Sequence, residues 1–346
     1  MRMTFGLRGA AVTVAAVALM MAGAQQALAA DDYSVEKTWK IGGDGGWDYL
    51  TVDSGNHILY IARGNRIQIV DTQSGKLLKE ITGFQGTHGV ALDSAGKYGY
   101  ISDGRANTVS VFDRSTYAVT ATIPAGENPD GILFEPQTQR VFAFNGRSKN
   151  ITVIDAASNK VLATIPGTGK LEFPQTDGKG TVWVNVEDKS EILKIDAQTM
   201  KVTAKWSVLP CEEPSGLAFD AAHRRLFSVC DKVMAVSDGD AGKVVAHVAI
   251  GDGPDAAAFD AKSGLAFSSN GEGTLTVVKQ NSADSYAVVQ TLKTMKGART
   301  MALDPATGLA YTVTAEFGPA PAATAENPHP RPAILPHSFV VLVLGK

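Results

Sequence analysis

The chain has little cysteine, few aromatic residues and no dense run of positive charge. Two of its 346 residues are cysteine, 7% are aromatic and 19% are charged. Its 32 lysines and arginines, against 35 aspartates and glutamates, form no cluster that could follow a phosphate backbone. We therefore expect no nucleic-acid partner. After residue 30, no apolar run reaches the roughly 20 residues that a membrane-spanning helix needs, so we expect no membrane insertion.

Sequence motifs of the common catalytic classes are also missing. The G-x-S-x-G, H-E-x-x-H, P-loop and C-x-x-C patterns do not occur. The glycine-rich stretch GGDGGWD at residues 42–48 precedes a strand-like segment rather than a helix, so it does not predict a phosphate site. The sequence leaves open whether the protein is an enzyme.

Residues 1–30 have the three parts of a secretory signal peptide. Arg2 and Arg8 precede an apolar run, and Ala27 and Ala29 form an A-x-A cleavage site. The alternative is a membrane anchor, but the apolar run is short for one. We predict a mature protein of residues 31–346 that is periplasmic or secreted.

A repeat of 41 or 42 residues runs through the mature chain. Apolar pentads such as IQIVD, VSVFD and ITVID recur at this interval and end at Asp71, Asp113, Asp155, Asp196, Asp238 and Lys279. Between them lie short segments rich in Val, Ile, Phe and Thr, separated by turn-forming residues, which indicates four strands per repeat. Four strands in about 40 residues are typical of a β-propeller blade.

We therefore predict an all-β fold, a seven-bladed β-propeller with almost no helix. Seven segments are expected to begin a blade: 46–53, 87–93, 129–135, 173–177, 214–220, 254–260 and 299–304. The last repeat lacks a fourth strand, and residues 35–42 match the pattern of one. The N-terminal strand is expected to complete the last blade and close the ring, which leaves no free sheet edge. We expect a monomer because such a ring needs no second copy.

Two stretches also resemble a known repeat. LYIARGNRIQIVDTQSGKLLKEI (59–81) and VFAFNGRSKNITVIDAASNKVLATI (141–165) are similar to the YVTN-type β-propeller repeat of YncE-like periplasmic proteins. The namesake tetrapeptide is degenerate and is nearest in AYTVTAE (310–316). The resemblance implies a propeller over the whole mature chain. It also implies an association with single-stranded DNA, which the acidic residues described below oppose.

A proline-rich insertion interrupts the last repeat. Residues 315–339 hold six of the fifteen prolines, and 65 residues instead of 41 or 42 separate Lys279 from Leu344. We predict that residues 315–337 form a flap over or beside the mouth of the central channel. A decorative loop and a contact surface for a partner protein are the alternatives.

Two positions in each predicted blade, before strand 1 and at the end of strand 2, are expected to converge on one rim. They are Asp48, Arg63, His88, Asp103, Asp130, Asn145, Gln175, Glu187, Glu213, Asp231, Asp255, Asn270, Arg299 and Glu316. From these we predict a ligand-binding set: His88, Asp103, Asp130, Asn145, Glu187, Glu213, Asp255, Asn270, Arg299 and Glu316. Cys211 and Cys230 are expected to form a disulfide across this rim.

Eight of the fourteen rim residues are carboxylic acids, which repel one another unless a cation lies between them. A divalent cation held by Glu187, Glu213, Asn145, Asp255 and His88 would satisfy them. The structural alternative is that Asp, Asn and Gly are ordinary turn formers. We predict an exported protein that binds a small ligand, a metal ion or a protein partner at the channel mouth. The alternative is a metal-dependent hydrolase or lyase of the lactonase type that uses rim carboxylates.

Overall fold

A computed structural model describes residues 1, 3, 32–322, 324, 330 and 332–346. The predicted signal peptide thus lies outside the described residues, apart from Met1 and Met3. Residues Asp32–Lys346 form one compact unit. Its regular structure is β-strand with one 3₁₀ helix, η1 (Glu187–Lys189), which confirms the all-β prediction. Within the described residues, no helix has the length and apolar character needed to cross a bilayer.

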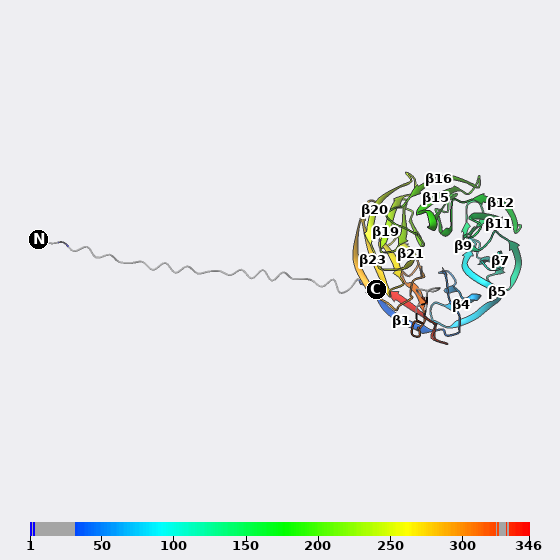
Figure 1. The fold of residues 1–346 in the computed structure, drawn as a ribbon, viewed down its shortest axis with the longest axis horizontal. Coiled ribbons are helices and arrows are strands. Elements are labelled where there is room, and N and C mark those ends of the chain that lie inside the picture. Colours follow the sequence, from blue (N-terminus) through cyan, green and yellow to red (C-terminus); the bar gives the residue numbers. More distant parts are fainter. Residues whose placement is uncertain (2, 4–31, 323, 325–329, 331) are drawn as a thin grey trace. The chain divides into compact units, whose positions relative to one another are not determined.

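The described strands form six antiparallel sheets, five with four strands and one with seven. In hydrogen-bonding order, the four-stranded sheets are β1 (Ser34–Lys40), β27 (Val340–Gly345), β26 (Ala310–Thr314), β25 (Met301–Leu303); β12 (Lys160–Pro166), β11 (Asn150–Asp155), β10 (Arg140–Asn145), β9 (Pro129–Glu135); β13 (Leu171–Thr176), β14 (Thr181–Val186), β15 (Glu191–Asp196), β16 (Lys201–Ser207); β17 (Leu217–Asp220), β18 (Arg225–Cys230), β19 (Val233–Asp238), β20 (Lys243–Ala249); and β21 (Pro254–Asp260), β22 (Leu265–Asn270), β23 (Thr274–Ser282), β24 (Ser285–Lys293). The seven-stranded sheet runs β2 (Leu50–Asp53), β3 (Ile58–Ala62), β4 (Gly64–Asp71), β5 (Leu77–Leu92), β6 (Tyr98–Asp103), β7 (Thr108–Asp113), β8 (Val119–Pro124). Figure 1 shows the sheets following one another around a common centre.

The number of separate sheets differs from the seven predicted, because β5 is continuous. Its first part pairs with β4 through Leu77 to Thr82, and its last part pairs with β6 from Thr87 to Leu92. The connecting residues 83–86 stay extended, with Gly83 at a φ of 101° that only glycine adopts without strain. One strand therefore joins two groups of strands into a single seven-stranded sheet.

The hydrophobic core lies between neighbouring sheets. Phe142 and Phe144 of β10 belong to one buried cluster with Val182 and Val184 of β14, in the next sheet along the chain. Each such side chain contributes about 1.5–3 kcal/mol when it leaves water. The outermost strands, such as β12, are mostly exposed because no further strand covers them. This packing explains why the middle strands are apolar on both faces.

The recurring aspartates that end the third strand of each repeat are structural. Asp155 accepts hydrogen bonds from the backbone N–H and the hydroxyl of Ser158, and Asp196 does the same with Thr199. These bonds lower the pKa of both carboxyls. They fix the tight turn into the fourth strand, which is why the sequence repeats an acid there.

The two ends of the compact unit are joined. Strand β1 pairs antiparallel with β27, so Ser34 lies opposite Gly345 and Lys40 opposite Val340. Just before β1, the Tyr33 ring packs edge-on against Phe267 at 5.0 Å, and its hydroxyl donates to the Gly308 carbonyl at 2.9 Å. The N-terminal segment thus contacts the sheet of β21–β24 as well as its own.

Both ends of the predicted flap form a short antiparallel ladder. The Leu335 N–H donates to the Glu316 carbonyl and the Gly318 N–H to the Ala333 carbonyl, each at 2.8 Å, and Phe317 pairs with Ile334. Residues 323, 325–329 and 331 of the flap lie outside the described residues.

Candidate functional site

Seven side chains, one from each repeat of the sequence, line one cavity. They are Asp48, His88, Asp130, Glu172, Ser215, Asp255 and Arg299, and we call them the seven-residue ring. Six lie just before or at the start of the first strand of their repeat, and His88 lies inside the continuous strand β5. Asp130, Glu172 and Asp255 are each the second residue of their strand, in β9, β13 and β21. Strands of equal position in successive repeats therefore deliver one polar side chain each to the same place.

The seven-residue ring lines a cavity of about 570 Å³. Nine of the sixteen residues around this acidic cavity are carboxylic acids, and the fixed cations among the sixteen are Lys170 and Arg299. Four predicted acids are present, namely Asp130, Glu187, Glu213 and Asp255, together with the predicted His88 and Arg299. The structure therefore brings six of the ten predicted ligand-binding residues together.

Hydrogen bonds connect neighbouring members of the ring. The imidazole Nδ1 of His88 lies 2.7 Å from Asp48 Oδ2 and 3.5 Å from Asp130 Oδ1. On the other side, the Ser215 hydroxyl donates to Asp255 Oδ1 at 2.7 Å, and Arg299 Nε lies 3.2 Å from Asp255 Oδ2. Potential ligand atoms of Asp48, His88 and Asp130 all lie within 4.8 Å of one another, which is the spacing of a metal-binding group.

The electrostatics of His88 follow from these neighbours. Burial opposes its charged form, but the hydrogen bond to Asp48 and the charges of Asp130, Asp48 and Glu172 outweigh burial and raise its pKa to about 9. At neutral pH the imidazole is therefore a cation between the carboxyl groups of Asp48 and Asp130. A metal ion bound there would have to displace that proton.

Burial raises the pKa of the most enclosed acids in the ring. For Asp130, burial outweighs the lowering effect of the nearby His88 charge. For Glu172, burial acts together with the charge of Asp130, against the hydrogen bond from Lys170. Burial also raises the pKa of Asp255, although Arg299 and Ser215 oppose the shift. Burial therefore favours the neutral, protonated form of these carboxyls, and a bound cation would favour the ionised form.

Lys170 and Tyr49 partly satisfy Glu172. The ammonium of Lys170 lies 2.8 Å from Glu172 Oε1 and also contacts Glu187, while the buried Tyr49 hydroxyl lies 3.2 Å from Glu172 Oε2. Of these four residues, Glu187 alone was predicted. Aligning LEF with the PDG and PDA of β9 and β21 could have identified Glu172, because all three place an acid second in the strand.

Four predicted residues do not line the acidic cavity in the described structure. Asp103 accepts the N–H groups of Gln85 and Gly86, while Asn145 donates to Thr152 and Asn270 to Thr276. Glu316 lies at the base of the flap, where its carbonyl accepts from Leu335. Asp103, Asn145 and Asn270 are the last residues of β6, β10 and β22, the second strand of their repeats. Their side chains form hydrogen bonds with neighbouring loops and strands and do not line the cavity. Asn145 is therefore separated from the rest of the predicted metal set.

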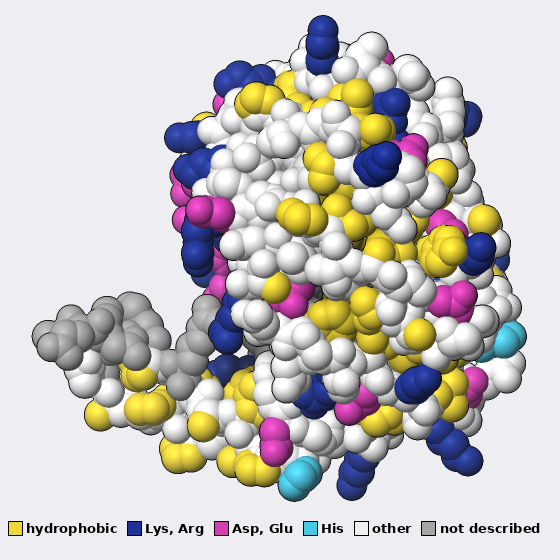
Figure 2. Space-filling view, turned by 90° about the vertical axis from the view of Figure 1, so that its right-hand side faces the viewer, with side chains coloured by type: hydrophobic (Ala, Val, Ile, Leu, Met, Phe, Trp, Pro, Cys, Tyr) yellow, Lys and Arg dark blue, Asp and Glu magenta, His cyan; other side chains and the backbone are white. Residues whose placement is uncertain are grey.

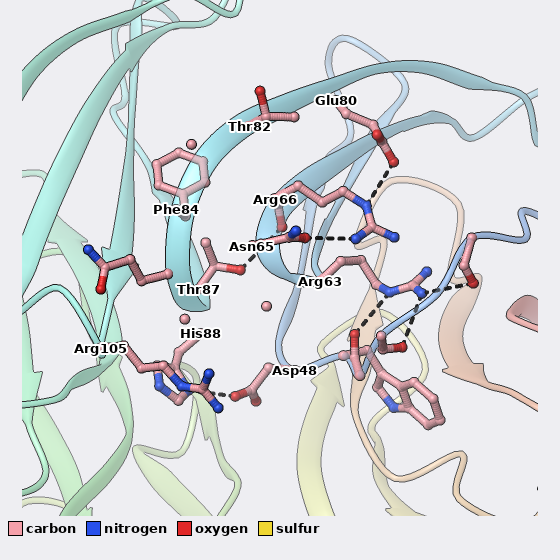
Figure 3. Close-up of a pocket in the computed structure, with 18 of the residues that line it drawn as sticks. Asp48, Arg63, Asn65, Arg66, Glu80, Thr82, Phe84, Thr87, His88 and Arg105 are labelled. Atoms are coloured by element: carbon pink, nitrogen blue, oxygen red, sulfur yellow. Dashed lines mark hydrogen bonds and ion pairs between the residues drawn. The ribbon is translucent and has the colours of Figure 1, made fainter. Parts of the chain in front are cut away.

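Arg63, which the sequence placed at the rim, organises a loop. Its guanidinium donates to the carbonyl groups of residues 42–46 and to Gln68, and lies 3.6 Å from the centre of the Phe339 ring. Burial, then the charge of Arg66, lowers the pKa of Arg63 to about 10. Arg63 lines the same cavity as Asp48 and His88 (Figure 3). Arg63 holds the glycine-rich loop in place.

The predicted disulfide is present between Cys211 and Cys230, whose Cα atoms lie 5.3 Å apart. It joins the segment before β17 to the end of β18. Glu212 and Glu213, which follow Cys211 directly, both line the acidic cavity. The disulfide therefore fixes two of its carboxylates.

Two further cavities adjoin the acidic one. A cavity of about 1080 Å³ shares Asp48 and His88 with it and has Arg66 and Arg105 in its wall (Figure 3). The other, of about 450 Å³, shares Gly253 and Arg299 with the acidic cavity.

Comparison with known proteins identifies the fold. No known protein family and no curated protein sequence matches the chain. Among solved structures, the WD40 repeats of RRP9 superpose with a TM-score of 0.73 at 10% identity, covering 91% of this chain and 98% of that one. U3-55K superposes with a TM-score of 0.71 at 10% identity, covering 90% of this chain and 98% of that one. Hydrazine synthase of Kuenenia stuttgartiensis superposes with a TM-score of 0.67 at 17% identity, covering 77% of this chain and 92% of that one. At such low identities these likenesses concern fold alone: the chain has the fold of the β-propeller proteins.

Proposed function

We propose that the protein is an exported, seven-bladed β-propeller that binds a small cationic ligand in the acidic cavity, at the mouth of the central channel. In this proposal the continuous strand β5 joins two blades, and the pairing of β1 with β27 closes the ring. Seven equivalent ring residues support seven blades. The signal-peptide pattern of residues 1–30 supports export, and the repeats resemble the YVTN type.

One observation carries the choice of a cationic ligand. Nine carboxylic acids surround the cavity, with Lys170 and Arg299 as the fixed cations, and Asp130 and Glu172 are respectively 13% and 9% exposed. Acids this enclosed repel one another and lose hydration, so a positive charge placed among them stabilises the folded protein. On the side of the molecule drawn in Figure 2, basic side chains are scattered among acidic and apolar ones and form no continuous stripe. Nucleic acid is therefore not the proposed ligand.

The test is to titrate calcium chloride and butylamine hydrochloride separately into the mature protein by calorimetry. We expect at least one of them to bind, and the double variant Asp130→Asn/Asp255→Asn to bind about tenfold more weakly or worse, because a charged hydrogen-bond partner is worth about 1.5–3 kcal/mol. Glu36→Gln, which removes an exposed carboxylate on β1, is the matched control. Absence of binding by both cations would overturn the proposal.

The second candidate is a metal-dependent hydrolase or lyase, favoured by the Asp48, His88 and Asp130 group. These residues would hold a divalent cation that polarises a substrate carbonyl, and a neighbouring carboxylate would serve as base. This candidate predicts about one divalent ion in protein purified without chelator, and a melting temperature that falls on adding EDTA. A protein without such an ion that does not respond to EDTA would contradict it.

A further inference from the structure

An apolar pocket lies next to the acidic cavity. Its volume is about 450 Å³, and Trp47, Phe317, Pro332 and Ile334 supply its apolar wall. Phe317 and Ile334 come from the two paired ends of the proline-rich segment, and the Trp47 ring centre lies 6.2 Å from that of Phe317. The insertion thus adds an apolar surface that the regular repeats do not contain.

Glycine lines the connection between the two spaces. Gly253 and Arg299 belong to the walls of both, and Gly271 and Gly297 also line the apolar pocket. Gly253 has a φ of 62°, so a side chain there would be strained. Asp252 and Asp255 flank this segment on the side of the acidic cavity. No side chain at Gly253 separates these carboxylates from the apolar pocket.

Charge differs between the two ends of this connected space. Lys296 lies in the wall of the apolar pocket and Arg299 lines both spaces, whereas acids dominate the acidic cavity. Arg299 directs its Nε to Asp255 at 3.2 Å and remains 44% exposed. A positively charged group is therefore repelled at the apolar end and attracted at the acidic end, which gives an extended ligand one preferred direction.

We propose that the acidic cavity and the apolar pocket form one two-part site for an organic ammonium ion that has an apolar group. The ammonium lies near Asp252 and Asp255, and the apolar group lies against Trp47, Phe317 and Ile334. This inference rests on the proposed cation-binding function and specifies its ligand class. It assigns the proline-rich segment a role in ligand selection.

The test compares phenylbutylamine, butylamine and phenylbutanol by calorimetry on the mature protein. We expect phenylbutylamine to bind about tenfold or more tightly than butylamine, because burying a phenyl group gains about 1.5–3 kcal/mol. Phenylbutanol, which lacks the charge, should bind at least as weakly as butylamine. Phe317→Ala should remove the preference for phenylbutylamine over butylamine, while Phe317→Leu should keep most of that preference.

Phe84→Ala is the matched control, since Phe84 is a half-buried phenylalanine in the wall of the other neighbouring cavity. Equal affinities for phenylbutylamine and butylamine would overturn the two-part site and leave the cation-binding function standing. A preference for the phenyl group that survives Phe317→Ala would also overturn it. Failure of every amine and of calcium to bind would overturn both.

Discussion

At the residue scale, His88 is the most informative side chain of the ring. It lies between Asp48 and Asp130, at 2.7 and 3.5 Å, and its side chain is 23% exposed. Its position stabilises a site rich in acids, because the imidazolium neutralises part of the negative charge. The imidazolium of His88 would release its proton if a metal ion bound to the ring nitrogen.

His88 should make stability depend on pH. Its pKa rises from 6.5 to about 9 on folding, so its stabilising contribution is complete below the unfolded pKa and is lost as pH rises through about 9. In urea unfolding, His88→Gln should lower the free energy of unfolding by at most about 3 kcal/mol below pH ~6, and by much less above pH ~9. His247→Gln, on the exposed face of β20, is the control. A loss that is constant over this pH range would contradict the prediction.

At the element scale, inserted or cross-linked segments shape the site more than the regular strands do. The strands of each repeat are similar, and each brings a single ring residue to the cavity. The Cys211–Cys230 disulfide adds Glu212 and Glu213, and the proline-rich segment adds Phe317 and Ile334. The ligand specificity that we propose therefore depends on segments that depart from the repeat.

Removing the disulfide should weaken both stability and cation binding. The double variant Cys211→Ser/Cys230→Ser frees a loop of sequence separation 19, which predicts a loss of about 2–4 kcal/mol in the free energy of unfolding. Butylamine or calcium binding should also weaken, because Glu212 and Glu213 lose their fixed position. Wild-type protein with a reducing agent should behave like the double variant. Unchanged stability in both samples would show that the loop is held by its packing alone.

At the scale of the whole molecule, the junction of the two chain ends is the feature to test. Strand β1 completes the sheet of β25–β27, and Tyr33 ties the same segment to β22 through Phe267. The buried Tyr33 is 4% exposed; its backbone N–H donates to the side-chain carbonyl oxygen of Gln290, and its backbone carbonyl accepts from the Gln290 side-chain amide. Loss of the pairing between β1 and β27 would leave β27 as an unpaired sheet edge.

We expect Tyr33→Ala to lower the free energy of unfolding by about 3 kcal/mol, since a large buried aromatic side chain is lost. Tyr33→Phe keeps the ring against Phe267 and loses the hydrogen bond to Gly308, so its cost should be about 1 kcal/mol. Denaturant unfolding measures both, with the exposed Glu36→Gln as control. If both substitutions change the free energy of unfolding by the same small amount, the N-terminal segment contributes little to the stability of the junction.

Much of the fold could be predicted from the sequence. The 41- or 42-residue period, the alternation of apolar segments with turns, and the acid at the end of each third strand depend on local chemistry that repeats along the chain. These features give the four-strand unit, confirmed for β9–β12, and the turn role of Asp155 and its equivalents. The cysteine pair was also predictable, since antiparallel strands bring those two positions together.

The membership of the site could not be predicted fully. Gln175 was placed at the rim instead of Glu172, because this strand was predicted to begin at Phe173, whereas β13 begins two residues earlier, at Leu171. Asn145 and Asn270 looked like ligands, yet each side chain bonds to a threonine on the next strand. A shift of one residue turns a strand side chain to the other face, and the sequence alone does not specify such shifts.

The sequence by itself thus determined a repeated all-β chain with an acidic set of residues at equivalent positions, because period and residue type are local properties. Only the tertiary structure decided which of those acids face one another, how deeply Asp130 and Glu172 are buried, and that the proline-rich segment places Phe317 beside Trp47. These facts depend on how separate sheets meet, and pKa values and binding surfaces follow from distances between residues far apart in the chain.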